Sequence, residues 1–331
     1  MINLAIFGTG RIGTVHALNA AANPEANVKY LVDPVRSHHM TELAKKTAAL
    51  EADVDTVFAD EDVHGIVIAS STDSHADLLM RAARAGKAVF CEKPISLDFA
   101  TTISTVESLE QSDIRCMMGF QRRYDPDFRT LKERLSNGTA GHIEQILMIS
   151  RDPFPPPIGY IKRSGGMFLD QSIHDLDMAR YLLGEEIKTV YAVGNCLENA
   201  AIGDAGDIDT AMITLTSISG RFVQISNSRR SAFGLEQRVE VLCSKEVLSI
   251  GNRGHSLLTI ADHQGLTSSQ PENHFIDRFA WSYRAEMQAF IELIETGTPA
   301  LTNIRDGLEA QRLAVAALES MHTGNIVELE R

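Results

Sequence analysis

The first third of the chain alternates short, continuous apolar runs with helix-like segments. The runs are rich in Val, Ile and Phe, and they cover residues 4–7, 28–32, 54–58, 65–69, 87–91 and 115–119. Runs that are continuous rather than alternating are typical of strands covered on both faces of a parallel sheet. The segments between them predict helices over residues 14–22, 74–85 and 99–110. This alternation predicts a Rossmann-type, doubly wound parallel sheet.

The pattern of apolar positions changes after residue 119. Residues 121–126 show no strand period, and residues 127–135 and 168–183 predict helices on either side of a proline-rich loop. Strands at short spacing are predicted over residues 189–195, 209–216, 220–228, 237–243, 246–250 and 256–260. Several alternate apolar and polar residues, which is typical of an antiparallel sheet with one packed face. Helices over residues 282–295 and 306–320 close the chain.

Together these elements predict an α/β protein with two domains. Residues 1–120 form a dinucleotide-binding Rossmann domain, and residues 121–331 form an α+β domain with a large, mainly antiparallel open sheet. The length of 331 residues agrees with this division, because it exceeds what one ordinary core supports.

Composition and charge exclude several other classes of protein. The chain is 44% hydrophobic and 23% charged, which excludes global disorder. Its formal net charge of −13 disfavours a surface that coats nucleic acid. We find no signal peptide, no apolar stretch of membrane-spanning length and no paired cysteine or histidine spacing that suits a metal. We therefore expect a cytoplasmic protein with reduced thiols and no metal.

A glycine-rich loop follows the first predicted strand and opens a helix. It consists of Gly8, Thr9, Gly10, Arg11, Ile12 and Gly13. In such a loop the first glycine permits a tight turn, the second admits a pyrophosphate, and the third lets helix and strand pack closely. Asp33 ends the second strand, where a carboxylate binds the ribose hydroxyls of NAD and repels a 2′-phosphate. Arg36 follows shortly and leaves NADP open as a secondary cofactor.

Two further motifs carry candidate chemistry. Lys93 stands in a Glu-Lys-Pro motif after the fifth predicted strand, at the edge of the sheet where ligands bind. Asp170, His174 and Asp177 stand at i, i+4 and i+7 of a predicted helix and so share one face. A histidine with a carboxylate one turn away on either side suits an oriented general base. An ordinary surface lysine and a solvated polar face are the alternative interpretations.

In order along nearly the whole chain, these motifs resemble the Gfo/Idh/MocA oxidoreductase family. The motifs are the loop from Gly8 to Gly13, Ser71-Thr72-Asp73-Ser74-His75, Glu92-Lys93-Pro94, Gly119-Phe120-Gln121-Arg122-Arg123, and Gly165-Gly166 leading into Asp170 and His174. Within the family the sequence looks most like the inositol 2-dehydrogenases, on residues 150–153, 160–166, 174–180 and 202–207.

The resemblance implies NAD as cofactor and a catalytic set of Lys93, Asp170 and His174. His174 would take the proton of a substrate hydroxyl while the hydride leaves the same carbon for the nicotinamide. Asp170 would bind the neighbouring hydroxyl, and Lys93 would polarise the reacting oxygen. The expected reaction is oxidation of a secondary hydroxyl of a cyclic polyol, with myo-inositol giving 2-keto-myo-inositol (scyllo-inosose).

Further site residues follow from the same resemblance. Besides the glycine-rich loop, Asp33 and Arg36, the implied cofactor contacts are Ser71, Thr72, His75, Glu92 and Lys93. The residues placed at or near the polyol pocket, besides the catalytic set, are Arg123, Arg151, Asp177 and Tyr283. Three of these have structural alternatives: His75 as a helix cap, Tyr283 as a packing residue, and Arg123 as the partner of an acid such as Asp125.

One departure from the family pattern bears on the substrate. Leu235 stands where close relatives tend to carry a tyrosine, and leucine cannot offer a hydroxyl to a substrate. This keeps open another cyclitol such as scyllo-inositol, or a pyranose sugar. A non-catalytic nucleotide-sensing regulator on the same fold is a third possibility, against which the retained Lys-Asp-His set stands.

The second predicted sheet also bears on assembly. Val223 and Ile225 are predicted to lie on one face of this sheet, with Phe222 and Gln224 on the other. A broad sheet face that its own helices do not cover usually finds a partner. Since the family tends to pair such faces, we expect a symmetric homo-oligomer, a dimer or tetramer, with a monomer as the alternative.

Overall fold

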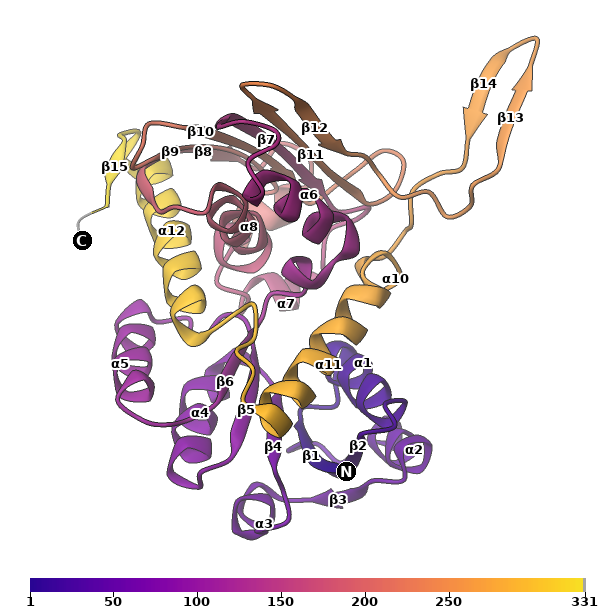
Figure 1. Ribbon diagram of the computed structural model, residues 1–331, viewed down its shortest axis with the longest axis vertical. Coiled ribbons are helices and arrows are strands. Elements are labelled where there is room, and N and C mark those ends of the chain that lie inside the picture. The colour runs from indigo at the N-terminus through magenta and orange to yellow at the C-terminus, as the bar shows by residue number, and fades with distance from the viewer. Residues whose placement is uncertain (330–331) are drawn as a thin grey trace. The chain divides into compact units, whose positions relative to one another are not determined.

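Residues 1–329 are described by the computed structural model, and they form two compact units (Figure 1). Unit 1 comprises Met1–Asp125 and Trp281–Glu309, and unit 2 comprises Pro126–Ala280 and the residues from Ala310 onward. The predicted boundary at residue 120 lies close to the first of these division points. The return of residues 281–309 to unit 1 departs from the predicted domains of residues 1–120 and 121–331.

Unit 1 is built on a six-stranded parallel sheet. Its strand order is β3-β2-β1-β4-β5-β6. The bounds are β1 Ile2–Phe7, β2 Ala26–Val32, β3 Leu50–Ala52, β4 Gly65–Ile68, β5 Ala88–Glu92 and β6 Cys116–Gly119. Its helices are α1 Arg11–Ala21, α2 His38–Thr47, α3 Val54–Ala59, α4 His75–Arg84, α5 Phe99–Glu110 and α11 Ala280–Thr296, with short 3₁₀ turns η1 Thr72–Ser74 and η2 Gln121–Tyr124. The doubly wound sheet is confirmed, and its order reverses between β1 and β4, where such sheets bind ligands.

One predicted strand of unit 1 is wrong. Residues 54–58 belong to α3, and the strand at that edge of the sheet is β3, a few residues earlier. Asp53 caps α3, because its Oδ1 accepts a hydrogen bond of 2.7 Å from the backbone N–H of Thr56. A capped helix start of this kind outweighs the β propensity of a short apolar run.

The late helix α11 completes the core of unit 1. Phe290 packs against Phe90 of β5 with ring centroids 5.7 Å apart, and Met287 joins the same buried cluster. A Cβ on Gly65 of β4 would lie 2.6 Å from Ile294 Cδ1, so this glycine makes room for α11. A helix distant in sequence therefore covers one part of the parallel sheet.

Unit 2 contains a seven-stranded, mainly antiparallel sheet. Its strand order is β12-β11-β7-β10-β9-β8-β15, in which only the β7–β10 pair is parallel among the described strands. The bounds are β7 Ile143–Arg151, β8 Ile187–Asn195, β9 Thr210–Ser217, β10 Phe222–Ser228, β11 Glu236–Cys243, β12 Val247–Ile250 and β15 Val327–Glu328. The predicted open sheet is confirmed, while β7, an interior strand between β11 and β10, has no counterpart among the predicted elements.

Helices and one separate hairpin make up the rest of unit 2. The helices are α6 Pro126–Ser136, α7 Ile158–Ile161, η3 Phe168–Ser172, α8 Ile173–Leu183, α9 Ala200–Asp204, α10 Phe275–Arg278 and α12 Ile304–Thr323, within which the division between the units falls. The hairpin of β13 Thr259–Asp262 and β14 Gly265–Ser268 extends as an arm beyond the seven-stranded sheet (Figure 1).

The predicted helix over residues 168–183 has two parts. Phe168–Ser172 form a π-helical turn, and the α-helix α8 begins only at Ile173. A π turn holds more residues than an α turn, so the predicted i, i+4, i+7 face does not continue unchanged through Asp170. Local π turns of this kind are frequent at functional sites.

The two faces of the seven-stranded sheet differ in burial. Val223 and Ile225 are buried, whereas Phe222 is 55% exposed, as predicted from the alternation. The outward face also carries the apolar residues Tyr191, Val193, Met212, Leu242 and Val247, each at least 39% exposed. Within residues 1–329, no helix combines the length and apolar character needed to cross a membrane.

Candidate active site

The glycine-rich loop has the close packing that its spacing predicts. Gly8 has a φ of +91°, and a Cβ there would lie 2.5 Å from the carbonyl oxygen of Ala69. A Cβ on Gly13 would lie 1.9 Å from the carbonyl oxygen of Gly8. Both positions therefore exclude a side chain, because the loop, the helix and β4 approach one another too closely.

The space over Gly10 is open instead of filled. A Cβ at this residue would meet nothing within 4 Å. Gly10 is also the N-cap of α1 and offers no side-chain hydrogen bond to the first backbone N–H groups. These groups and the positive end of the helix dipole suit an anion such as a pyrophosphate, so the cradle fits a dinucleotide.

Asp33 lies directly after β2 and is held by the loop. Its Oδ2 accepts hydrogen bonds from the backbone N–H (2.8 Å) and the hydroxyl (2.9 Å) of Thr9. Its Oδ1 accepts one from the N–H of Val35 at 2.9 Å. Partial burial favours the neutral acid, but these hydrogen bonds outweigh it and lower the pKa of Asp33. The carboxylate is thus fixed and ionised at the end of β2, while Arg36 is exposed.

His75 connects the loops that follow β4 and β5. Its ring is buried at the start of α4, with Nδ1 2.8 Å from the carbonyl oxygen of Pro94 and Nε2 3.1 Å from that of Ser70. Burial lowers the pKa of His75, although both carbonyls favour the charged ring. Ser71 and Thr72, which are also predicted to contact the cofactor, lie at the start of η1, where Ser71 is exposed.

The end of β5 carries the Glu-Lys-Pro motif. Lys93 is half-buried, and the Glu92 side chain turns into unit 1. There its Oε1 lies 2.7 Å from Nε2 of His16 on α1. Tyr283, expected near the polyol pocket or in packing, is 3% exposed, and its ring contacts that of His16 edge-on at 5.9 Å.

Arg123 is tied into unit 1. Its Nη1 donates to the carbonyl oxygen of Leu301 and its Nη2 to Asp306 Oδ1, both at 2.9 Å. Asp306 is thus one acid that pairs with Arg123, as the structural alternative expects. The side chain is 6% exposed. These contacts favour the structural alternative for Arg123, and its contact with substrate stays a prediction.

In unit 2, Asp170 belongs to a network of charged and polar groups. Arg229 is 1% exposed, and it donates from Nη1 to Asp170 Oδ2 at 3.1 Å and from Nη2 to Asp207 Oδ2 at 2.8 Å. The hydroxyl of Tyr160 donates to Asp170 Oδ1 at 2.8 Å. Asp207 in turn accepts a hydrogen bond of 2.9 Å from the N–H of Met167 just before the π turn. Tyr160 and Arg229 therefore orient the two oxygens of the Asp170 carboxylate, and Asp207 holds Arg229 in place.

The start of α8 presents His174 beside strongly buried acids. His174 is half-buried, whereas Asp175 and Asp177 are each 1% exposed. Asp175 accepts hydrogen bonds from Ser150 of β7 at 2.6 Å and from Asn227 of β10 at 2.9 Å. These bonds fix α8 on the two central strands of the sheet and so fix the direction of His174.

Two other predicted residues of unit 2 are held by their surroundings. Arg151, at the end of β7, donates from Nη1 to Glu236 Oε2 at 2.9 Å, and Arg238 donates to the other oxygen at 2.8 Å. Leu235 is 4% exposed, so its side chain is packed inside unit 2 and does not lie on an open surface.

Sequence reasoning missed four residues of these networks. Arg229 and Tyr160 contact Asp170, while His16 and the buried Glu286 of α11 lie beside Glu92. His16 had a usable signal, since it follows the glycine-rich loop one helical turn after Gly13. Arg229 and Glu286 had none, because their partners Asp170 and Glu92 lie far away in sequence.

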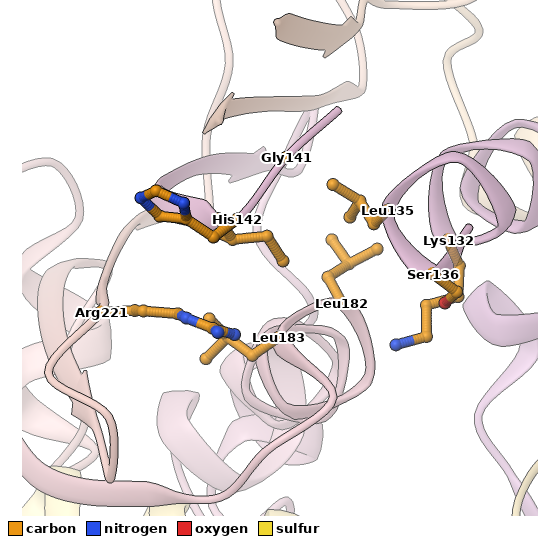
Figure 2. Close-up of a pocket in the computed structure, with 9 residues that line it drawn as sticks. Lys132, Leu135, Ser136, Gly141, His142, Leu182, Leu183 and Arg221 are labelled. Carbon is orange, nitrogen blue, oxygen red and sulfur yellow. The ribbon is translucent and has the colours of Figure 1, made fainter. Parts of the chain in front are cut away.

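An open pocket in unit 2 is separate from all predicted site residues. It measures about 300 Å³, and Figure 2 shows His142 and Arg221 on one side of it with Lys132 on the other. The remaining lining residues are Leu135, Ser136, Gly141, Ile143, Leu182 and Leu183. Because it lacks the groups that carry the predicted chemistry, we do not assign it as the active site.

The fold and the loop geometry define a class of protein, an oxidoreductase with a dinucleotide-binding Rossmann unit. Residues 2–120 match the model of an oxidoreductase family with an NAD-binding Rossmann fold, and residues 128–249 match the GFO/IDH/MocA C-terminal domain. The chain belongs to the Gfo/Idh/MocA oxidoreductase family.

Individual relatives are similar over their whole length. The myo-inositol 2-dehydrogenase of Thermotoga maritima is 39% identical over 331 residues, with 99% of each chain covered. The crystal structure of a myo-inositol dehydrogenase from Corynebacterium glutamicum has a TM-score of 0.95 at 38% identity, covering 100% of this chain and 99% of that one. A scyllo-inositol dehydrogenase from Lactobacillus casei, crystallised with NAD(H) and scyllo-inositol, has a TM-score of 0.91 at 29% identity, with 99% of each chain covered.

Proposed function

We propose that this protein is an NAD-dependent dehydrogenase that oxidises a secondary hydroxyl of a cyclic polyol. The favoured reaction converts myo-inositol to 2-keto-myo-inositol. The observation that carries this proposal is the hydrogen bond from buried Arg229 to Asp170, on a chain that retains Lys93 and His174. Support comes from the full-length similarity to the myo-inositol 2-dehydrogenase of Thermotoga maritima.

The nicotinamide, when bound, accepts the hydride from the substrate carbon. His174 accepts the proton of the same hydroxyl, so the C–H and O–H bonds break and the carbonyl forms. Lys93 donates a hydrogen bond to the reacting oxygen and stabilises its anionic character. Asp170, which is held by Tyr160 and Arg229, accepts a hydrogen bond from the neighbouring hydroxyl.

The cofactor side of the proposal rests on the glycine-rich loop and Asp33. The fixed carboxylate of Asp33 repels a 2′-phosphate, so NAD is preferred and NADP is at most a secondary cofactor. Cofactor contacts from Ser71, Thr72 and His75, and polyol contacts from Arg123, Arg151, Asp177 and Tyr283, remain part of this proposal.

A second candidate substrate is scyllo-inositol or another cyclitol. Leu235 favours it, since the buried leucine offers no hydroxyl where close relatives tend to carry tyrosine. The relative from Lactobacillus casei with bound scyllo-inositol supports the same class of substrate.

We also propose a homo-oligomer of cytoplasmic location. The exposed apolar residues on the outward face of the seven-stranded sheet support self-association, with a second copy of the chain as the partner. The β13–β14 hairpin of the same unit is also exposed along both strands. The absence of paired thiols among the described cysteines is compatible with a reducing compartment.

A substrate panel tests the proposed reaction. Purified protein is assayed with NAD or NADP and with myo-inositol, scyllo-inositol, glucose and an acyclic polyol, and NADH fluorescence is followed. We expect the highest kcat/KM for a cyclitol with NAD, and a rate of oxidation that rises from acidic to mildly alkaline pH because His174 must be neutral. A much higher kcat/KM for glucose would show that the substrate is a sugar and not a cyclitol. No turnover with any of these compounds would favour the non-catalytic, nucleotide-sensing regulator.

A further inference from the structure

The side chain of Glu92 lies at the meeting point of four elements of unit 1. Its Oε1 is 2.7 Å from Nε2 of His16 on α1. On the other side, a Cβ on Gly119 of β6 would lie 2.7 Å from Oε2, so this glycine makes room for the carboxylate. Glu286 of α11 completes the group, since one carboxyl oxygen each of Glu286 and Glu92 and one ring nitrogen of His16 lie within 4.8 Å of one another.

Glu286 is the unusual member of this group. Its side chain is 0% exposed, and neither carboxyl oxygen has a hydrogen-bond partner among the residues that the structure describes. Burial, and then the charge of Glu92, raise the pKa of Glu286 well above its usual value. Two ionised carboxylates so close in a buried place would repel each other strongly.

The charged and titratable groups around the cluster come from every element packed against it. They are Arg11 and His16 of α1, Glu92 of β5, Arg122 of η2, and Tyr283 and Glu286 of α11. The two arginines act on the Tyr283 side, where burial raises the pKa of the phenol well above its usual value. Glu286 itself faces Glu92, and no cation pairs with it among the described residues.

The backbone next to this cluster carries Lys93. On one side of Lys93, the Glu92 side chain is held by His16. On the other side, the carbonyl oxygen of Pro94 is held by the buried ring of His75 at 2.8 Å. The residues on both sides of Lys93 are therefore each held by a buried histidine, Glu92 by His16 and Pro94 by His75.

Resting on the proposed function, we propose that His16 and Glu286 are positioning residues for Lys93. Glu286 packs beside the Glu92 carboxylate in the buried interior of unit 1, and His16 contacts its Oε1. Together they fix the end of β5 and hence the place from which Lys93 reaches the reacting oxygen. The same three donors are close enough to bind a divalent cation, but His16 and Glu92 already pair directly, so the test treats the cation as the competing outcome.

The first measurement is independent of catalysis. The infrared spectrum of the wild type at neutral pH is compared with that of Glu286→Gln, which is neutral at every pH. We expect the C=O stretching band of one protonated carboxyl in the wild type and its loss in the variant. Absence of that band, or one divalent metal per chain by elemental mass spectrometry, would overturn the proposal.

The second measurement separates positioning from simple stability. Glu286→Gln and His16→Gln retain a polar group, whereas Glu286→Leu and His16→Leu remove it, and Glu292→Gln on the exposed side of α11 is the control. We expect the Leu variants to lower kcat by roughly 10- to 100-fold with the KM for NAD nearly unchanged, and the Gln variants to stay within about 3-fold of wild type. Equal loss in the Gln and Leu variants, or a loss that falls on KM, would contradict a positioning role.

Hydrogen exchange covers the case in which no cyclitol is oxidised. Mass spectrometry of the peptide around Lys93 should show faster amide exchange in Glu286→Leu than in Glu286→Gln and wild type. Unchanged exchange in Glu286→Leu would overturn the inference. If no cyclitol in the substrate panel is oxidised, the proposed function is overturned. The proposed anchoring of β5 is then tested by the hydrogen-exchange and infrared measurements.

Discussion

The guanidinium of Arg229 lies 3.1 Å from the carboxylate of Asp170 inside unit 2, and Arg229 is 1% exposed. The same guanidinium holds Asp207, which binds the backbone just before the π turn. A single buried cation therefore orients Asp170 and fixes the turn that carries it. Breaking a buried ion pair leaves an unpaired charge in the protein interior, so we expect substitution of Arg229 to destabilise the fold.

Replacing Arg229 with methionine tests that relationship. We expect a loss of about 3–5 kcal/mol in the free energy of unfolding, because two carboxylates are left without their partner. We expect kcat/KM to fall by roughly 100-fold even where the variant is folded, because Asp170 is no longer oriented. Chemical denaturation and cyclitol oxidation measure the two effects. Arg230→Met is the matched control: this neighbour is exposed, 3.7 Å from Glu198, and its loss should change both values little.

A pair of glycines in the cofactor loop separates folding from binding. Gly10→Ala places a methyl group in open space, so we expect unchanged thermal stability and NAD affinity weakened by about 10-fold or more, since the methyl occupies the pyrophosphate cradle. Gly13→Ala places its methyl 1.9 Å from the carbonyl oxygen of Gly8, so we expect a loss of about 1–3 kcal/mol in stability. Calorimetry with NAD and thermal unfolding distinguish the two. Equal NAD affinity in Gly10→Ala and wild type would mean that the pyrophosphate does not approach Gly10.

The carboxylate of Asp209 predicts a pH dependence of stability. It is 2% exposed and accepts hydrogen bonds from the backbone N–H groups of Leu197, Glu198 and Asn199. Although burial opposes the charge, these bonds lower the pKa of Asp209 to about 2. A lowered folded-state pKa contributes stability above the unfolded value near 3.8 and loses it as the pH falls toward 2.

Asp209→Asn should therefore be less stable than wild type by about 2 kcal/mol at neutral pH. The difference should narrow as the pH falls below about 4, because the wild-type carboxylate becomes protonated there. Urea unfolding at a series of pH values measures it. A gap that stays constant down to the lowest pH would show that the charge of Asp209 does not contribute.

The outward sheet face predicts the oligomeric state. Met212 of β9 is 46% exposed and lies opposite Val193 of β8 in the register of the sheet. Met212→Glu introduces a charge into this apolar face and should reduce the sedimentation coefficient of the oligomer to that of a smaller species. Ile218→Glu, at an exposed turn position, is the control and should leave it unchanged. A wild-type protein that sediments as a monomer would contradict the proposed assembly.

Much of the fold can be predicted from local pattern. The continuous apolar runs predict the parallel strands of unit 1, and the alternation at Phe222 and Val223 predicts the two faces of the second sheet correctly. Errors arise where a local polar contact outweighs an apolar run, as with the cap at Asp53, or where the helical period changes, as in Phe168–Ser172. The return of α11 to unit 1 depends on packing against β4, which no local pattern contains.

The candidate site also contains some residues that local sequence predicts and others that depend on the folded chain. Gly8, Gly13 and Asp33 can be predicted because the glycine spacing and the place of the acid at the end of the second strand are visible in the sequence. Arg229 and Glu286 cannot, since their partners, Asp170 and Glu92, are brought to them only by the folded chain. These buried groups contact or adjoin predicted site residues, and no local pattern in the sequence places them there.

The most direct test of the central claim is single-turnover oxidation of myo-inositol by wild type and by Lys93→Met and His174→Gln, with NAD affinity measured on the same samples. The account predicts NADH formation by wild type and a loss of about 10³-fold or more in the rate for both variants, while NAD still binds to each. Undiminished oxidation by either variant, or no cyclitol oxidation by wild type with bound NAD, would contradict it.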